Sequence, residues 1–207
     1  ITVTAAAGTL TGTTLNSGVV TSSLTTVGAL NSGSITSGFG AIDIGTDTVT
    51  CGGIINANAN GIGNIGSSTT YFNTVFAKST SAQYADIAEK YSSDYAYEPG
   101  TVVSFGGEQE ITITTQANDN SVAGVVSTNP AYIMNSGIQA QHSVEVALTG
   151  RVPTKVVGPV KKGNMMVSAG NGYAQACATP SIGTVIGKAI ENFDGDQGII
   201  EIVVGRM

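Results

Sequence analysis

Apolar positions in the first 77 residues recur at short, irregular intervals between Thr, Ser and Gly, a pattern that fits neither a helical stripe nor a long alternating strand. The tetrapeptide LNSG occurs at Leu15–Gly18 and again at Leu30–Gly33. Short strands separated by Gly or Asn-Ser turns explain this spacing better. We therefore expect a repetitive β structure in which each rung packs its apolar side against the next. The apolar positions are Leu10, Leu15, Val20, Leu24, Leu30, Ile35 and Phe39.

Such rungs can stack within one chain as a β-helix-like solenoid, or three chains can interweave around a common axis. Each rung offers only one or two inward apolar residues, so a single chain would have a thin core, and three chains are favoured. A flexible Gly/Ser/Thr-rich linker is the remaining alternative, against which the regular Leu, Val and Ile positions argue.

The second half of the chain reads as many short strands separated by glycine turns. This composition predicts an all-β head, either a compact barrel or a sandwich. The expected strands are Thr101–Phe105, Ile111–Thr115, Val122–Ser127, Val144–Leu148, Val152–Val157, Val185–Ala189 and Ile199–Val204. Turn signals lie at 106–107, 118–120, 150, 158–159, 162–164 and 170–172.

One segment has helical spacing. In Ala82–Tyr91, the side chains of Tyr84, Ile87, Ala88 and Tyr91 would fall on one face of a helix. We expect a short helix here that links the shaft to the head.

The composition changes sharply near Lys78. Asp43 and Asp47 are the only charged residues before it, whereas all 8 basic residues and all 5 prolines occur from Lys78 onwards. Two segments with such different compositions are not expected to share one hydrophobic core. The predicted organisation is a repetitive β shaft over residues 1–77, a linking segment with the short helix over 78–98, and a globular β head over 99–207.

The net charge of -6 opposes binding to phosphate backbones and anionic lipid surfaces. No apolar run approaches the roughly 20 residues of a membrane span. We therefore expect neither a nucleic-acid partner nor membrane insertion. The chain starts at Ile1 in place of an initiator Met, so we expect a fragment or a processed product.

The segment Gly61–Gly66, GIGNIG, matches the glycine pattern of dinucleotide-binding proteins. That chemistry also needs a following helix whose N-terminus meets the pyrophosphate. Here SSTTYFNTVFA follows, which reads as a turn and then a strand. We interpret the glycines as turn residues, and we predict no cofactor.

The sequence contains no convincing metal site. Cys51 and Cys177 are too few and too far apart for a disulfide framework or a metal centre, and we interpret them as reduced, partly buried small residues. The segment Asp194–Gly198, DGDQG, lacks the further ligands of a calcium loop and fits a hairpin turn. Lys161 and Lys162 precede another turn and form a solvated charged corner.

Catalytic candidates are equally sparse, and we predict no catalytic residues. His142 is the only histidine, and its neighbour Ser143 would point to the opposite face of a strand, so the two would not form a nucleophile–base pair. Asp43 and Asp47, in DIGTD, would lie about 13 Å apart on a strand. That distance is longer than the usual separation of the paired carboxylates of a glycan-degrading tailspike, although trimer symmetry could bring those of other copies closer.

Tyrosines cluster at one place, where the predicted shaft meets the head. Tyr84, Tyr91, Tyr95 and Tyr97 are suited either to stacking on sugar rings or to burying area at an interface. We expect them mainly to pack at the junction.

From Asn64 onwards the chain resembles the distal region of tailed-bacteriophage fibres and appendages. The junction NIGSSTTYFNTVFAKSTSAQYADIAEKY carries the resemblance, together with YEPGTVVSFGG, VAGVVSTNPAYIMN, VALTGRVPTKV, GPVKKGNMMVS, GTVIGKAIE and IEIVVGRM. More distantly, the C-terminal part is similar to autoproteolytic intramolecular chaperone domains.

This resemblance implies a structural, homotrimeric virion protein, assembled in the host cytoplasm and carried on the particle surface. Its partners would be its own copies, other virion proteins and a host-surface glycan or protein receptor. The alternative that the resemblance raises is a head that guides trimerisation and is then cut off near Ser92, Ser93 and Asp94. No motif for scission is identifiable there.

Overall fold

A computed structural model describes residues 43–54, 64–67, 69–78 and 81–205 of the chain. The chain divides into two units, Ile1–Phe72 and Asn73–Met207. Both LNSG copies and most of the predicted shaft lie outside the described residues. The described part of the first unit contains turns, at Ile44–Asp47 and Ser67–Thr70, and no strand.

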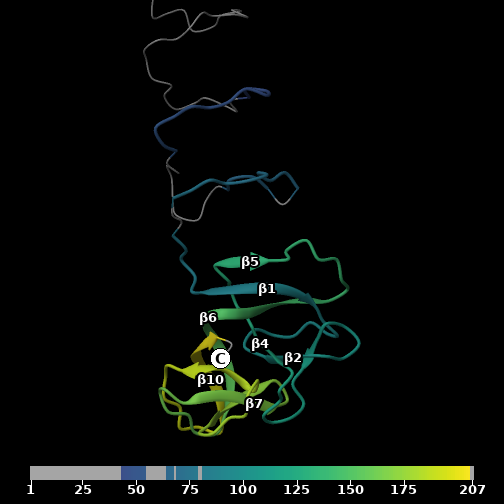
Figure 1. The fold of residues 1–207 in the computed structure, drawn as a ribbon, viewed down its shortest axis with the longest axis vertical. Helices are drawn as coiled ribbons and strands as arrows, with labels where there is room; N and C mark the ends of the chain where they lie inside the picture. The colour runs from purple at the N-terminus through teal and green to yellow at the C-terminus, as the bar shows by residue number, and fades with distance from the viewer. Residues whose placement is uncertain (1–42, 55–63, 68, 79–80, 206–207) are drawn as a thin grey trace, which may run out of the picture. The chain divides into compact units, whose positions relative to one another are not determined.

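The second unit is all-β, and no helix occurs among its described residues (Figure 1). Its strands are β1 (Asp86–Ser92), β2 (Val102–Phe105), β3 (Ile111–Ile113), β4 (Val122–Val126), β5 (Tyr132–Met134), β6 (Ser143–Val157), β7 (Met165–Gly170), β8 (Tyr173–Cys177), β9 (Val185–Ala189) and β10 (Gln197–Gly205).

The long strand β6 organises the fold. Its C-terminal half pairs with β10, from Thr149 to Val157, and pairs with β8 at Val156. Strands β8, β7, β9 and β10 pair in that order, so the ring closes back on β6 and forms a β-barrel. The predicted barrel-or-sandwich head is therefore a barrel at this end.

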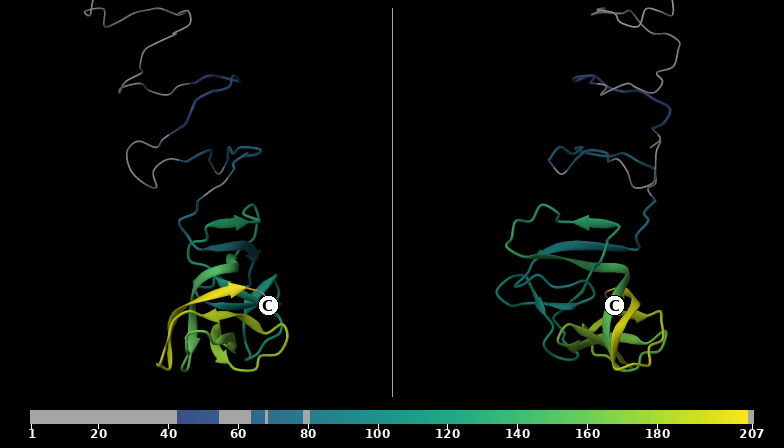
Figure 2. Two further views of the ribbon diagram at one scale, coloured as in Figure 1. Left: turned by 60° about the vertical axis from the view of Figure 1, so that its left-hand side comes forward. Right: turned by 180° about the vertical axis from the view of Figure 1, so that it is seen from behind.

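The N-terminal half of β6 belongs to a second layer. It pairs with β1 on one side and with β4 on the other, and β2 and β3 continue outward from β4. Strand β5 pairs in parallel with β1 and forms the edge, and Figure 2 shows these strands beyond one end of the barrel.

Two apolar clusters fill these layers. The larger lies in the barrel and includes Val152, Met166 and Ile202, all fully buried. The smaller lies between β2, β3, β4 and the start of β6, around Val103, Ile111 and Val146, with Tyr91 and Tyr97 packed against it. Branched Val and Ile residues dominate both clusters, as expected for pleated, half-buried strands.

The predicted helix at Ala82–Tyr91 is wrong. Residues 86–92 form β1, which is hydrogen-bonded to β5 and β6 on its two edges. The helical spacing of Tyr84, Ile87 and Ala88 is coincidental, since Ala88 is buried in the sheet whereas Ile87 is 40% exposed. Pairing with distant strands overrides the local pattern.

The strands expected at 101–105, 111–115, 122–127, 185–189 and 199–204 are confirmed, with small shifts at their ends. The break expected at Gly150 is wrong, because β6 runs through it. The sequence pattern also missed β5, β7 and β8, although the turn predicted at 170–172 does join β7 to β8.

Candidate functional site

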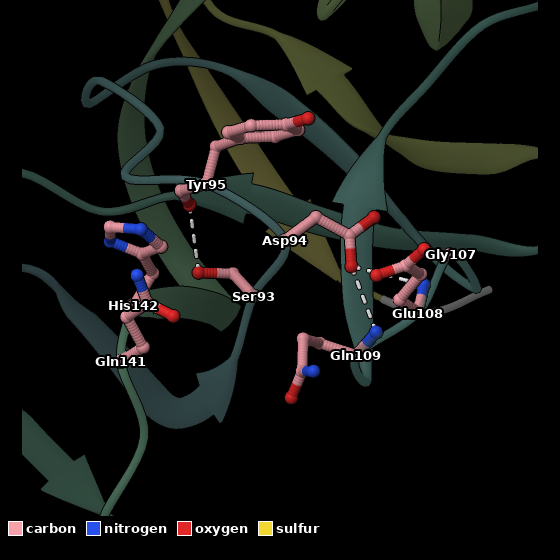
Figure 3. Close-up of a pocket in the computed structure, with 8 residues that line it drawn as sticks. All are labelled: Ser93, Asp94, Tyr95, Gly107, Glu108, Gln109, Gln141 and His142. Atoms are coloured by element: carbon pink, nitrogen blue, oxygen red, sulfur yellow. Dashed lines mark hydrogen bonds between the residues drawn. The ribbon is translucent and has the colours of Figure 1, made fainter.

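A polar pocket of about 490 Å³ opens where the end of β1 meets the β2–β3 hairpin and the start of β6. Figure 3 shows His142 and Gln141 on one side of Ser93 and Asp94, with the hairpin loop on the other. The lining residues are Ser93, Asp94, Tyr95, Gly107, Glu108, Gln109, Gln141 and His142.

Asp94 holds the hairpin loop in place. Its Oδ1 accepts hydrogen bonds from the backbone N–H groups of Gln109, at 2.8 Å, and Glu108, at 3.1 Å. Gly107 has φ +86°, and a Cβ at this position would collide with the Asp94 carboxylate. Only glycine therefore fits the turn without displacing the carboxylate that organises it.

These contacts also set the charge of the pocket. The hydrogen bond from the Gln109 backbone and one from the Thr112 side chain lower the pKa of Asp94 below its ordinary value of 3.8. Donors that bind a carboxylate favour its ionised form. Asp94 is thus an anion at neutral pH, engaged with its own loop.

The serines near the predicted scission region are also engaged. The Ser93 hydroxyl donates to the backbone carbonyl of Tyr95 at 2.9 Å, and its N–H donates to the carbonyl of His142 at 3.1 Å. In the described part of the chain, no hydrogen bond joins a serine hydroxyl to the His142 imidazole. The Ser93 hydroxyl is therefore engaged with the backbone and not with the only histidine of the chain.

Ser92 is tied to the same hairpin. Its N–H and its hydroxyl both donate to Oε2 of Glu110, each at 2.9 Å. One carboxylate oxygen thus caps the end of β1 and joins it to β3. Neither Glu110 nor this contact was foreseen from the sequence, because Glu110 lies 18 residues further along the chain, just before β3.

The tyrosine cluster separates into different roles. The ring of Tyr91 meets Phe105 edge-on, with centroids 5.7 Å apart, and its hydroxyl donates to Glu89 at 2.6 Å. Tyr95 and Tyr97 form a second edge-to-face pair at 6.3 Å. Tyr84 is 53% exposed and takes part in neither pair.

The acidic segment, the lysine pair and the two cysteines singled out from the sequence lie in different parts of the chain. The segment Asp194–Gly198 lies in the connection between the antiparallel strands β9 and β10, as predicted for a hairpin, and it enters β10 at Gln197, which pairs with Val157 of β6. Lys161 and Lys162 are exposed at the turn before β7, as expected. Cys177 is partly buried and Cys51 is exposed, so the prediction for Cys51 is wrong; both thiols are free.

Asp43 and Asp47 flank a turn and not a strand. The Gly45 N–H donates to Asp43 Oδ1 at 2.9 Å, and the Asp47 N–H donates to the carbonyl of Ile44 at 3.2 Å.

The glycine motif GIGNIG is described only in its second half, because Gly61–Gly63 lie outside the described residues. Gly66, its last residue, has φ +81° and precedes a turn in which the Ser67 N–H donates to the carbonyl of Thr70. The strand expected after this turn is not seen in residues 69–78.

Within the described ranges, no helix is long and apolar enough to cross a membrane. No protein-family model matches the chain, and no curated protein matches it.

Several solved phage structures are similar to it. The pre-mature gene product 12 of bacteriophage phi29 has 14% identity and a TM-score of 0.49, over 64% of this chain and 23% of that one. A C-terminal fragment of the same gene product has 15% identity and a TM-score of 0.43, over 58% of this chain and 99% of the fragment. The N base of the phi29 head fiber gp8.5 has 14% identity and a TM-score of 0.37, over 57% of this chain and 93% of that one.

Proposed function

We propose that this chain is the distal part of a phage fibre or virion appendage, in which three copies form an interwoven shaft and the β heads set their register. The residues that resemble phage fibres, from Asn64 onwards, and the all-β barrel head both support this assignment. The particle surface is the corresponding location, with assembly in the host cytoplasm.

The observation that carries the proposal is the exposure of large apolar side chains in the described residues before the head. Phe76 is 96% exposed, Ile54 89% and Ile65 87%. The others that are at least 60% exposed in this region are Tyr71, Phe72, Val75 and Val49.

Leaving so many large apolar groups in water is costly, because full burial of one such side chain is worth about 1.5–3 kcal/mol. Dense exposure of this kind marks an interaction surface. In a single-chain solenoid, neighbouring rungs would cover such groups, whereas Ile54, Ile65 and Phe76 are exposed in the described residues. Copies of the same chain are therefore the cover that we propose, and three of them give the shaft predicted from the repeats.

A fibre tip of this kind would have a mechanical and adhesive function. The shaft would hold the heads away from the particle, where they contact a host-surface glycan or protein receptor, while the other end joins further virion proteins. The Ser92 and Ser93 contacts to Glu110 and Tyr95 favour a head that stays folded as a unit over one built around a reactive serine.

The first test is the mass of the full chain under native and denaturing conditions. We expect a native mass of three chains that becomes one full-length chain after boiling in detergent. A native mass of one chain contradicts the proposal. Two denatured fragments, split near residues 77–95, would instead show that the head is an autoproteolytic assembly chaperone.

A matched pair of variants makes the test specific to the shaft. Asn73 is a polar, exposed residue three positions before Phe76 in the same segment. Phe76→Asp should reduce the trimer fraction strongly, because it places a charge at a buried contact. Asn73→Asp adds the same charge to the same segment and should leave the trimer intact. Equal behaviour of the two variants would contradict a buried position for Phe76.

A further inference from the structure

A second pocket lies at the surface of the barrel, beside the end of β10. Its volume is about 600 Å³, and it is lined from β6, β9, β10 and the turn before β7. Apolar side chains, among them Ile190 and Val203, make up much of this lining. Lys162 and Lys188 are the only charged residues among the described ones that line it. The pocket is therefore a cationic hollow with apolar walls.

Strand pairing brings more positive charge to the same surface. Val203 lies opposite Arg151 of β6 and opposite Lys188 of β9. Directly opposed residues on neighbouring strands share one face of a sheet. Val203 is 40% exposed, and both cations beside it are exposed. Lys161 is exposed next to Lys162, so four of the 8 basic residues of the chain lie at or beside the cationic hollow.

The chain does not neutralise this charge itself. In the part that the structure describes, no ion pair joins Arg151, Lys162 or Lys188 to an acidic side chain. The whole chain is acidic, with 14 acidic against 8 basic residues, so the cationic hollow differs in sign from the rest of the molecule. An apolar surface bordered by charges of one sign is typical of an interaction site, and its partner should be acidic and partly apolar.

The same chain carries an element of that kind in the β2–β3 loop (residues 106–110), whose residues are all exposed. The Glu110 carboxylate accepts hydrogen bonds from Ser92, whereas the Glu108 carboxylate has no partner in the described chain. Phe105, just before the loop, is 42% exposed. Strands β3 and β10 stand at opposite ends of the strand order, and Figure 1 labels β2 and β10 on different sides of the unit.

The β2–β3 loop is held in shape before it meets any partner. Asp94 Oδ1 accepts hydrogen bonds from the N–H groups of Glu108 and Gln109, and the Gly106 N–H donates to the carbonyl of Glu110 at 3.2 Å. A loop that is already ordered loses little conformational entropy when it binds. The contacts of Asp94 in the polar pocket thus prepare the loop for docking.

We propose that the β2–β3 loop of each head docks against the cationic hollow of a neighbouring copy in the trimer. Glu108 pairs there with Lys162 and Lys188, and the half-exposed side chains of Phe105 and Val203 lie within the contact. This inference rests on the proposed function and adds the surfaces by which the heads recognise one another. Because each copy offers one loop and one hollow on different sides, the contact is head-to-tail, and such contacts close into a ring when the rotation between copies fits.

A contact of this kind explains how heads can set register. Exposed ion pairs add little to affinity, but opposite charges favour one alignment, and like charges oppose the others. Heads that meet loop to loop or hollow to hollow place equal charges together. A second copy is the preferred occupant because it brings the acidic loop and the cationic hollow in equal numbers, which an unrelated acidic protein does not.

The test is cross-linking of the full chain with a zero-length carbodiimide, which joins a carboxylate to an amine that lies in contact with it. After denaturation in detergent, we expect bands of two and three linked chains. Peptide mass spectrometry of these bands should find Glu108 joined to Lys162 or Lys188. If this linkage is absent, or occurs only in the band of one chain, the proposal is wrong.

Charge reversal then tests the pairing. Glu108→Lys alone, or Lys162→Glu with Lys188→Glu, should each lower the trimer fraction at the wild-type urea midpoint about tenfold or more, because like charges then face each other. The three changes combined should restore the trimer and the cross-link, now between a lysine at position 108 and a glutamate in the hollow. Recovery in the combined variant cannot arise from misfolding. Failure of the combined variant to recover would overturn the inference.

Matched controls use neighbouring charges outside the contact. Lys161→Glu changes an exposed lysine next to Lys162 that does not line the hollow. Glu98→Lys changes an exposed acid outside the β2–β3 loop. Both should keep most of the wild-type trimer fraction and the Glu108 cross-link. Losses as large as those of the pocket and loop variants would mean that net charge alone controls assembly, and the specific contact would be refuted.

The native mass of each sample keeps the two proposals apart. A native trimer without a Glu108 linkage between chains removes the head contact and leaves the fibre assignment standing. A native mass of one chain contradicts both proposals. A native mass of two chains that carry the linkage keeps the head contact and contradicts the trimeric shaft.

Discussion

The Ser104 hydroxyl donates a 2.6 Å hydrogen bond to Oδ2 of Asp119, and both residues are buried. The other oxygen, Oδ1, accepts from the N–H and the hydroxyl of Ser121, at 2.9 and 2.6 Å. The N–H of Asp119 donates to the Ser168 hydroxyl at 2.8 Å. One side chain and its backbone thus join β2, the loop before β4, and β7.

Replacing this carboxylate should be costly. Asp119→Ala leaves the hydroxyl of buried Ser104 without its acceptor, and we expect the free energy of unfolding to fall by about 2–4 kcal/mol. Urea denaturation of the two proteins measures the difference. Asp196→Ala removes an exposed carboxylate and should change the free energy by less than about 0.5 kcal/mol. Equal effects at both positions would show that the Asp119 network contributes little.

The same residue should confer acid sensitivity. Burial raises the pKa of Asp119, but the hydrogen bonds from Ser104 and Ser121 outweigh it, and the net shift is downward from 3.8. A lowered folded-state pKa adds stability above the unfolded-state value, and this contribution disappears as the pH falls through the folded-state value.

The urea midpoint of the wild-type protein should therefore drop below about pH 4, near the ordinary pKa of an aspartate. Asp119→Asn should lower the midpoint at pH 6 and reduce its dependence on pH between 4 and 2.5. An unchanged pH profile in the variant would mean that other carboxyl groups control acid unfolding.

The β2–β3 hairpin provides a test of the first pocket. Gly107→Ala combines an unfavourable φ of +86° with a collision against Asp94, so it should lower the free energy of unfolding by more than about 1 kcal/mol. Gly137→Ala is the control, because its added Cβ meets nothing within 4 Å. If Gly107→Ala were as stable as Gly137→Ala, the loop would not have the geometry described.

The sequence predicts a strand best where inward-facing and outward-facing residues alternate regularly along that strand. In β10, Ile200, Ile202 and Val204 are buried, whereas Ile199 and Val203 are exposed, so the local pattern alone locates the strand. In β1 the information is not local. Its strand conformation depends on pairing with β5 and β6, and the spacing of Tyr84, Ile87 and Ala88 indicated a helix instead.

The candidate sites were harder to predict for the same reason. Asp94 and His142 were both identified from the sequence, but their position around one pocket beside the β2–β3 hairpin was not. The approach of β1 to β6 likewise depends on pairing between distant strands. Gly150 was interpreted as a break, but its missing side chain lets β1 approach β6. Register between distant strands determines these positions, and short apolar runs do not encode it.

The register of β10 in the barrel predicts opposite results for two isoleucines on that strand. Ile202 is fully buried opposite Val152, whereas Ile199 is 62% exposed opposite Lys155. Ile202→Ala removes packing from the barrel core and should lower the free energy of unfolding by about 2–5 kcal/mol. Ile199→Ala removes the same atoms from the outer face and should cost less than about 1 kcal/mol. A comparison of the two urea midpoints in one buffer is sufficient, because the chemical change is identical. If Ile199→Ala were the more damaging variant, the strand would present its opposite face to the core, and the pairing of β10 with β6 and β9 would be shifted by one residue.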